Sequence, residues 1–303
     1  MTQSLQAAVL HDRSLVAVSG PDRIKFLQGL TTNDVRRLAP DRALYAGFLT
    51  GQGKLLYDVF LIDDGDRVLI DIAGAQVEHF VKRLTGFKLR AAVEIGKTAP
   101  ALAVAALWGT AAAVRLTLEA TEGAVGHGAF AGPHHALVDP RIAALGVRLV
   151  YPADAAIEAE FDRLGFASAT ASDYAVHRLA LGIADTPEIA GETCYALEAN
   201  FEPLHGVDFR KGCYIGQELT ARMKLKVGLR KRILPVSGAT ALPAAGTLVT
   251  SDGMKLGPLI ATSGAHGLAL LRLDYLADAK TDAIRADYVG LSVHWPSWLP
   301  PAS

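Results

Sequence analysis

Cysteine is scarce in this 303-residue chain, which contains only Cys194 and Cys213. Two thiolates cannot complete a four-thiolate zinc or iron–sulfur site, and they do not build a disulfide-rich secreted scaffold. Cys194 could in principle pair with Cys213, but in a reducing compartment we expect both to be thiols. Any cluster held by a cysteine of this chain therefore needs further ligands from outside it.

The chain also lacks a net charge of either sign. Lysine and arginine number 30 against 31 aspartate and glutamate, so no overall field favours binding to nucleic acid. The N-terminus has no basic segment followed by a long apolar core, and we expect no signal peptide. The least charged apolar stretch, 98–114, falls short of the roughly 20 strongly apolar residues of a membrane helix. These features predict a monomeric, cytoplasmic protein that does not enter a membrane.

What is present is ordinary for a globular protein: half of the residues are apolar, and the length allows two or three domains. Residues 1–97 alternate short strands with amphipathic spacings, including a helix over 76–84 and a strand over 88–95, which is the pattern of a split βαβ, ferredoxin-like unit. A second α/β segment begins near residue 102. After Arg232, short strands separated by Gly, Pro, Asp and Ser indicate a small antiparallel barrel.

The segment 210–218, Arg-Lys-Gly-Cys-Tyr-Ile-Gly-Gln-Glu, carries the strongest chemical signal. Gly212 permits a turn with positive φ, and good helix formers follow. Cys213 would then lie near a helix N-terminus, where amide groups and the helix dipole favour an anion. With Arg210 and Lys211 alongside, we expect the thiolate of Cys213 to be the reacting or ligating form. The alternative is a buried cysteine acting as a small apolar side chain.

The run Lys-Gly-Cys-Tyr-Ile-Gly-Gln-Glu, continued by Ala221-Arg222, resembles the signature of the YgfZ family. Members of that family are folate-binding proteins related in fold to the glycine-cleavage T-protein, an aminomethyltransferase, and they act in iron–sulfur cluster assembly or repair. The segments 26–35, 139–148 and 178–183 also resemble the family. The resemblance is strongest over 24–58 and 178–232.

The resemblance implies an α+β fold with two ferredoxin-like α/β halves of the aminomethyltransferase folate-binding type, followed by a small C-terminal antiparallel β-barrel. The expected domains are 1–97 for the N-terminal ferredoxin-like part, 98–228 for the second α/β part with the cysteine motif, and 229–303 for the barrel.

The resemblance also implies a site around Cys213, as nucleophile or as a ligand shared with a cluster. The residues of its motif are Lys211, Gly212, Cys213, Tyr214, Gly216, Gln217 and Glu218. Asp58 lies in a segment similar to the T-protein strand with the catalytic aspartate, so it is expected beside the folate. Strand geometry equally allows Asp58 on a solvent face.

Three further residues are expected to contact folate by resemblance: Asn33, Glu192 and Arg222. For Asn33 the alternative is a stop at the end of a helix, since Asn, Asp and Thr side chains compete for backbone partners. The register near Glu192 is shifted, which makes Glu188 its substitute. The basic run 222–232 either flanks a helix end or faces an anion: a folate glutamyl tail, an acidic partner protein or RNA.

Taken together, these features predict a folate-binding accessory protein for iron–sulfur cluster assembly or repair. It would bind tetrahydrofolate or a derivative, and it would hold a transient cluster whose other ligands come from an iron–sulfur carrier or client enzyme. The alternative is an enzyme, a tetrahydrofolate-dependent aminomethyltransferase. A third reading is a structural adaptor that binds no folate.

Overall fold

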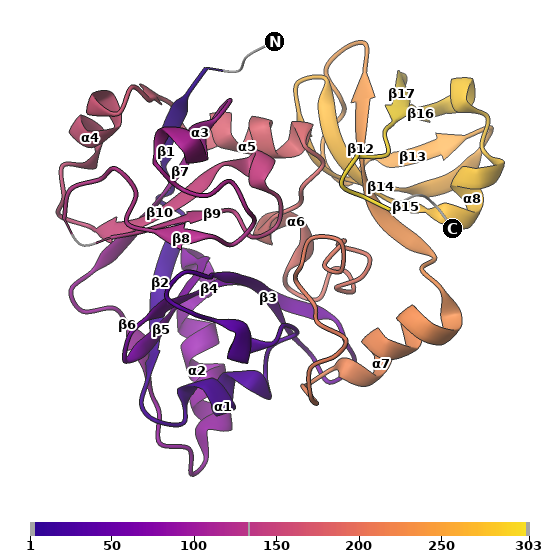
Figure 1. Cartoon of the computed structure of the whole chain (residues 1–303). Helices are drawn as coiled ribbons and strands as arrows, with labels where there is room; N and C mark the ends of the chain where they lie inside the picture. The colour runs from indigo at the N-terminus through magenta and orange to yellow at the C-terminus, as the bar shows by residue number, and fades with distance from the viewer. Residues whose placement is uncertain (1–3, 133, 301–303) are drawn as a thin grey trace. The chain divides into compact units, whose positions relative to one another are not determined.

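A computed structural model of the chain describes residues 4–132 and 134–300 (Figure 1). The chain forms two compact units. The first contains Met1–Leu49, Tyr57–Tyr174 and Leu204–Ile215, and the second contains Thr50–Leu56, Ala175–Pro203 and Gly216–Ser303. The domain boundaries at 97 and 228 stay predictions.

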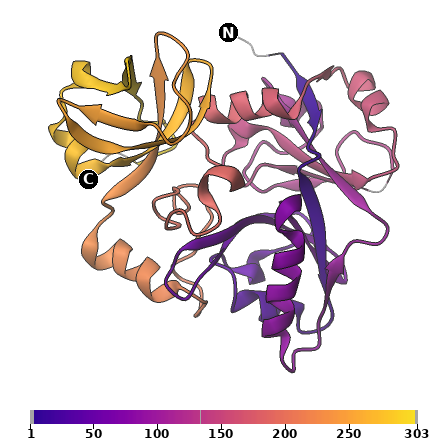
Figure 2. The same ribbon diagram turned by 180° about the vertical axis from the view of Figure 1, so that it is seen from behind.

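One sheet of the first unit has five strands in the order β3-β4-β5-β2-β6. The strands are β2 (Arg13–Ser19), β3 (Leu44–Leu49), β4 (Leu55–Asp64), β5 (Arg67–Ala73) and β6 (Glu94–Lys97). Short helical segments are α1 (Arg23–Gln28) and the 3-10 turns Val35–Arg37 and Gly74–Gln76. Helix α2 (Val77–Lys88) lies along this sheet (Figure 2) and buries Val77, Phe80 and Leu84, as its helical apolar spacing requires. The expected strand over 88–95 is wrong, because α2 continues to Lys88 and pairing begins only at Glu94.

The other sheet of the first unit has six strands in the order β11-β1-β7-β10-β9-β8. They are β1 (Gln6–Val9), β7 (Leu102–Trp108), β8 (Val125–Gly126), β9 (His135–Val138), β10 (Val147–Pro152) and β11 (Ala167–Ser168). Strand β1 pairs parallel with β11 and antiparallel with β7. The first strand of the chain therefore belongs to the second sheet.

The two sheets of the first unit share a core. Alternate residues of each strand point to opposite faces, and one face of each sheet packs against the other sheet. Val104 and Ala106 of β7 pack with Leu15 of β2 and Leu69 of β5. The intervening residue Leu107 faces the other way. Helices α3 (Ala112–Arg115) and α4 (Ile157–Arg163) pack against that other face, and a 3-10 turn spans Ala143–Leu145.

The second unit contains a closed barrel in the order β12-β15-β14-β13-β16-β17. Its strands are β12 (Lys231–Gly238), β13 (Leu248–Ser251), β14 (Met254–Ser263), β15 (His266–Arg272), β16 (Ile284–Ala286) and β17 (Val289–Val293). A closed barrel is what the short strands and turns after Arg232 predict.

Short helices complete the second unit. They are α6 (Thr186–Ile189), α7 (Gln217–Arg222) with a π-helical turn Met223–Val227, α8 (Leu273–Asp278) and the 3-10 turn Thr281–Ala283. Helix α5 (Ala171–Ala180) begins in the first unit and ends in the second. In the part of the chain that the structure describes, no helix is both long and apolar enough to span a membrane.

Candidate functional site

Cys213 lies on an irregular segment that precedes helix α7. Its side chain is exposed, which excludes the alternative of a buried apolar cysteine. The expected position at a helix N-terminus is wrong, because α7 begins only at Gln217. The residue with positive φ is Gly216, at 83°, and not Gly212. The turn that starts the helix therefore lies after the thiol.

The residues on either side of the thiol are buried. Lys211 and Tyr214 are only 5% and 7% exposed, whereas Gly212 and Cys213 between them are exposed. The Lys211 ammonium lies 5.0 Å from the centre of the Tyr214 ring. The backbone N–H of Ile215 donates to the carbonyl of Gly29 at 3.3 Å. Two anchored residues thus flank an exposed Gly-Cys pair.

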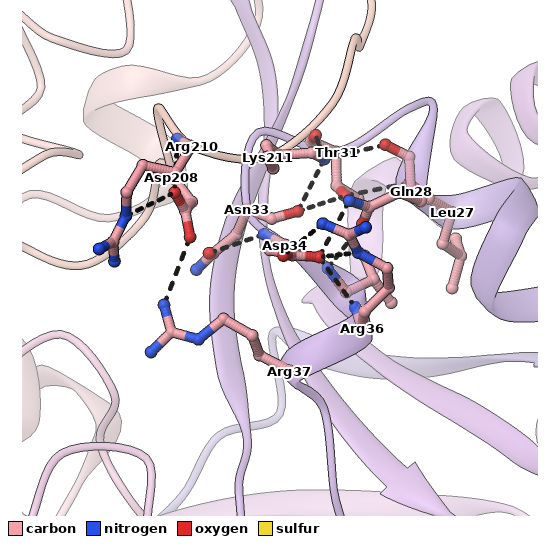
Figure 3. A network of polar contacts seen from close by, with 11 residues as sticks. Leu27, Gln28, Thr31, Asn33, Asp34, Arg36, Arg37, Asp208, Arg210 and Lys211 are labelled. Carbon is pink, nitrogen blue, oxygen red and sulfur yellow. Dashed lines mark hydrogen bonds and ion pairs between the residues drawn. The ribbon is translucent and has the colours of Figure 1, made fainter.

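The Lys211 ammonium is bound by backbone carbonyls from a distant part of the chain (Figure 3). It donates to the carbonyl oxygens of Gln28 at 2.9 Å, Thr31 at 2.5 Å and Asn33 at 2.8 Å. An ammonium has three donors and no acceptor, so these bonds use all of its protons. Burial lowers the pKa of Lys211 from 10.5 to about 8. The sequence indicated Lys211 only as a positive charge beside the thiol, and it did not predict this contact.

The turn that receives Lys211 is built by the run Thr31-Thr32-Asn33-Asp34. Thr31 Oγ1 donates to the carbonyl of Leu27 at 3.0 Å, at the end of α1. Thr32 Oγ1 donates to the carbonyl of Gly206 at 2.6 Å and accepts from the N–H of Gly47 at 2.7 Å. A single buried hydroxyl therefore links this turn to β3 and to the segment that leads to Cys213.

Asn33 has the same linking role. Its Nδ2 donates to the carbonyls of Tyr45 at 2.8 Å and His205 at 2.7 Å, and its Oδ1 accepts from the N–H of Asp34 at 2.8 Å. Both amide protons and the amide oxygen are thus engaged by backbone groups. This arrangement agrees with the alternative of a local structural role for Asn33.

Charged groups line the outer side of this turn (Figure 3). Arg36 forms two hydrogen bonds of 2.8 Å with the Asp34 carboxylate, which lower the pKa of Asp34 from 3.8 to about 2. The Asp208 carboxylate accepts from the backbone N–H of Arg210, two residues further on, at 2.7 Å. It also pairs with Arg37 at 3.4 Å. The exposed guanidinium groups of Arg36 and Arg37 are thus each paired with a carboxylate.

Asp58 is completely buried in β4, so the alternative of a solvent-facing side chain is wrong. Other buried charges of the first unit form a network. Asp71 accepts from Arg13 at 2.7 Å and from Arg148 at 2.7 and 3.0 Å. Burial alone lowers the pKa of Arg148, but Asp71 gives a net rise above its usual value.

The segment Asp139-Pro140-Arg141, which resembles the family, extends this group of buried charges. The Arg141 guanidinium binds the Asp139 carboxylate at 3.0 and 2.8 Å. Arg148, from the second part of that resemblance, lies 4.0 Å above the Phe60 ring and 3.9 Å from Asp139. These arginines therefore belong to the interior of the first unit.

The remaining expected folate contacts lie in the second unit. Glu192 is exposed, has φ of 70°, and donates its backbone N–H to the carbonyl of Leu55 at 2.8 Å. The Glu188 carboxylate, its proposed substitute, is bound by Arg178 at 2.9 and 3.0 Å and by the N–H of Asp185 at 2.6 Å. Of the two carboxylates, Glu192 is the one at the surface.

The basic run 222–232 is partly paired within the second unit. Arg222 and Glu218, both exposed, lie 3.6 Å apart on α7. Lys224 pairs with Glu202 at 2.5 Å, and Arg232 donates to Asn200 at 2.9 Å. In residues 4–132 and 134–300, no three His, Cys, Asp or Glu side chains gather as a metal site.

The fold identifies a class of protein. It superposes on the crystal structure of glycine cleavage system aminomethyltransferase T from Bartonella henselae with a TM-score of 0.78, covering 98% of this chain and 87% of that one. The sequence identity is 14%, so this likeness shows the fold alone. The expected aminomethyltransferase-type fold with a C-terminal barrel is confirmed.

The particular family follows from sequence. Residues 230–301 match the family model described as CAF17, C-terminal beta-barrel domain. The mitochondrial iron–sulfur cluster assembly factor IBA57 is 32% identical in Mus musculus and 33% identical in Homo sapiens, each match covering 97% of this chain and 85% of the relative. The Mycosarcoma maydis homolog is 34% identical over 74% of this chain, which spans 55% of that relative. The chain belongs to the family of the iron–sulfur cluster assembly factor IBA57.

This membership changes two expectations. The relatives carry the name IBA57, so the iron–sulfur assembly class of the resemblance is confirmed, whereas membership in the YgfZ family itself stays a prediction. The predicted cytoplasmic location is contradicted, because the matched relatives are named as mitochondrial proteins. A charge balance and an unremarkable N-terminus carry no compartment signal of their own, which is why the sequence misled here.

Proposed function

We propose that this protein is an accessory factor for iron–sulfur cluster assembly, and that Cys213 gives the cluster one thiolate ligand during transfer. The observation that carries the proposal is the exposed thiol between two buried, anchored residues. The relatives' names, iron–sulfur cluster assembly factors, support the same role.

The chemistry of the two cysteines supports a shared cluster. Thiolate is a soft ligand that suits iron–sulfur clusters, which take four protein ligands in the common case. Cys194 is 2% exposed, and its thiol donates to the carbonyl of Ile189 at 3.4 Å. Cys213 is therefore the thiol offered to a partner, and an iron–sulfur carrier or client enzyme would supply the other ligands.

The test compares two single substitutions in cells that lack their own IBA57 protein. Cys213→Ser is expected to abolish the recovery of iron–sulfur enzyme activities, because a hydroxyl is a poor ligand for a cluster. Cys194→Ala is the matched control and is expected to restore those activities like wild type. Full recovery with Cys213→Ser, at equal protein level, would refute the proposed role of the thiol.

We further propose that the protein binds tetrahydrofolate or a folate derivative, with Glu192 as the carboxylate for the pterin ring. A carboxylate can accept two neighbouring N–H donors of such a ring. Glu192 is exposed while Glu188 is bound to Arg178, and exposed Arg222 suits the anionic tail. Asn33 and Asp58, both of the first unit, are two further residues of the proposal; the Asn33 amide fixes its turn, and Asp58 is buried in β4.

Calorimetric titration with tetrahydrofolate tests this part separately. Wild type should show saturable binding that Glu192→Gln weakens and Glu188→Gln leaves at the affinity of wild type, provided both variants stay folded. Heat that never saturates would exclude folate binding and leave the cluster role intact. Release of formaldehyde during turnover would instead favour the aminomethyltransferase.

A further inference from the structure

The first of the two sequence motifs singled out above, 26–35, meets the beginning of the second, 211–215, within the first unit. Lys211 binds carbonyls that lie at the end of α1 and in the turn after it, about 180 positions away in the chain. The last carbonyls of a helix have no donor within the helix, so this is a natural place for a cation. The motif 26–35 provides the carbonyl acceptors, and Lys211 of the other motif provides the ammonium.

We propose that Lys211 is a positioning residue that fastens the Cys213 loop to the turn at 28–33 and thereby presents the thiol. The fastening itself follows from this geometry, whereas its effect on cluster transfer rests on the function proposed for Cys213. Lys211 is not proposed as a catalytic group, because its ammonium contacts the backbone of its own chain.

The chemistry of the contact favours lysine at this position. A buried ammonium is costly unless all of its protons are paired, and here three carbonyls at 2.5–2.9 Å pair them. Arginine carries its donors on a planar fork and cannot direct three of them from one nitrogen at one point. Methionine would fill similar space but offer the carbonyls no donor.

The position of the contact decides its consequence. Only Gly212 separates Lys211 from Cys213, so their Cα atoms are at most about 7 Å apart. On the other side, Tyr214 is buried and the N–H of Ile215 bonds to Gly29. Because the residues before and after them are held in place, Gly212 and Cys213 form a short exposed segment with restricted freedom to move.

Other bonds secure the segment before Lys211 and give independent probes. The N–H of Asp208 donates to the carbonyl of Thr32 at 3.1 Å, and Thr32 Oγ1 holds Gly206. If Lys211 fastens the loop, its loss should first weaken the neighbouring amide bonds of Asp208 and Ile215. If Lys211 contributed only to the overall stability of the unit, its loss would speed the exchange of all protected amides in the unit equally.

The experiment uses the full chain with Cys194→Ala, so that only Cys213 takes a nitroxide label. In Lys211→Met we expect a sharper, more mobile electron paramagnetic resonance spectrum at Cys213. We also expect the Asp208 and Ile215 amides to exchange at least about tenfold faster, because Lys211→Met removes all three bonds of the ammonium to the carbonyls of the turn. Lys211→Arg should give a label mobility and amide exchange rates between those of Lys211→Met and wild type. It replaces Lys211→Met in both measurements if that variant does not fold.

Two controls separate positioning from stability. Lys25→Met removes an exposed lysine of α1 and should change neither readout. Leu164→Ala removes buried volume beside α4 in the same unit and should lower its stability without mobilising the label. A label equally immobile in wild type and in a folded Lys211 variant would overturn the proposal.

Cluster transfer measured on the unlabelled variants distinguishes this proposal from the function on which it rests. A mobile loop with lost transfer supports both. A mobile loop with transfer at the wild-type rate supports the fastening role and contradicts a need for a positioned thiol. An immobile loop contradicts the fastening role whatever the transfer rate is.

Discussion

The interior of the first unit and the interior of the barrel are built from different side chains. The first unit buries charged residues with at most 7% exposure: Arg13, Asp58, Asp71, Asp139, Arg141 and Arg148. The barrel core is aliphatic, with residues such as Leu234, Val249, Leu256 and Leu271. An ion pair is satisfied in one arrangement of its partners, whereas aliphatic side chains can repack. The stability of the first unit therefore depends on particular pairs of charged side chains, and the stability of the barrel depends on the total volume of its aliphatic core.

The same contrast holds between the two cysteine environments. Cys194 is buried in the second unit, and its thiol donates to a backbone carbonyl. Cys213 is exposed, yet the backbone on both sides of it is fixed by polar contacts of the first unit. Polar contacts are directional, so they can hold an exposed group in place where burial cannot. The predictions below test how far this difference between directional and volume-based packing extends.

The largest effect is expected from Asp71→Ala. It removes the carboxylate that Arg13 and Arg148 share in the interior of the first unit. Removing one partner of a buried ion pair typically costs about 3–5 kcal/mol. Urea unfolding followed by fluorescence of Trp108, in a chain with Trp295→Phe and Trp298→Phe, measures this loss in the first unit.

The control for Asp71 is a surface pair of the same chemistry. Glu160 and Arg163 lie 2.7 Å apart with the arginine 52% exposed, so Glu160→Ala should cost about 1 kcal/mol or less. Asp71→Asn keeps the volume but not the charge, and it should still destabilise the unit strongly. An Asn variant as stable as wild type would show that shape, not charge, holds this core.

A smaller effect is expected from Leu234→Ala in the barrel. Leu234 is completely buried, and truncating a buried leucine costs about 2–5 kcal/mol through lost burial and a cavity. The volume-conserving Leu234→Met should cost less than about 1.5 kcal/mol. Trp295 and Trp298, in a Trp108→Phe chain, report this unit. A Met variant as damaging as the Ala variant would break the comparison, because the barrel would then need one exact packing as well.

Local patterns in the sequence predicted the regular parts of both units. The alternating strands after Arg232 gave the barrel, and the apolar spacing of 77–84 gave α2, because each signal lies within one element. Local sequence left open whether Cys213 is a reactive thiolate or a buried apolar side chain, and the structure shows it exposed. Where the sequence failed, the partner lay far along the chain: Lys211 binds Thr31 at a separation of 180 residues, and Arg148 binds Asp71 at 77.

The helix start near Cys213 was misplaced for a different physical reason. Either Gly212 or Gly216 could supply a turn with positive φ, and only the latter does. The buried anchors at Lys211 and Tyr214 hold 211–214 out of the helix, and no local propensity shows that. Asp58 was ambiguous for a similar reason, since neighbouring positions in a strand face opposite ways and both faces of β4 are buried.

The smallest effect is expected from Asp34. Its ion pair with Arg36 is less buried than the Asp71 network and less exposed than a pair in open solvent. Its pKa is about 2 in the folded chain, below the ordinary value of 3.8. The carboxylate therefore stabilises the fold above pH 4, and this contribution is lost as the pH falls through about 2. Arg36 is 62% exposed, which limits the contribution to about 1 kcal/mol. Asp34→Asn should be less stable than wild type by that amount at pH 5, with the difference closing toward pH 2 in unfolding followed by Trp108. A difference that stays constant with pH would mean that the side chain acts through its hydrogen bond from Gln28 and not through its charge.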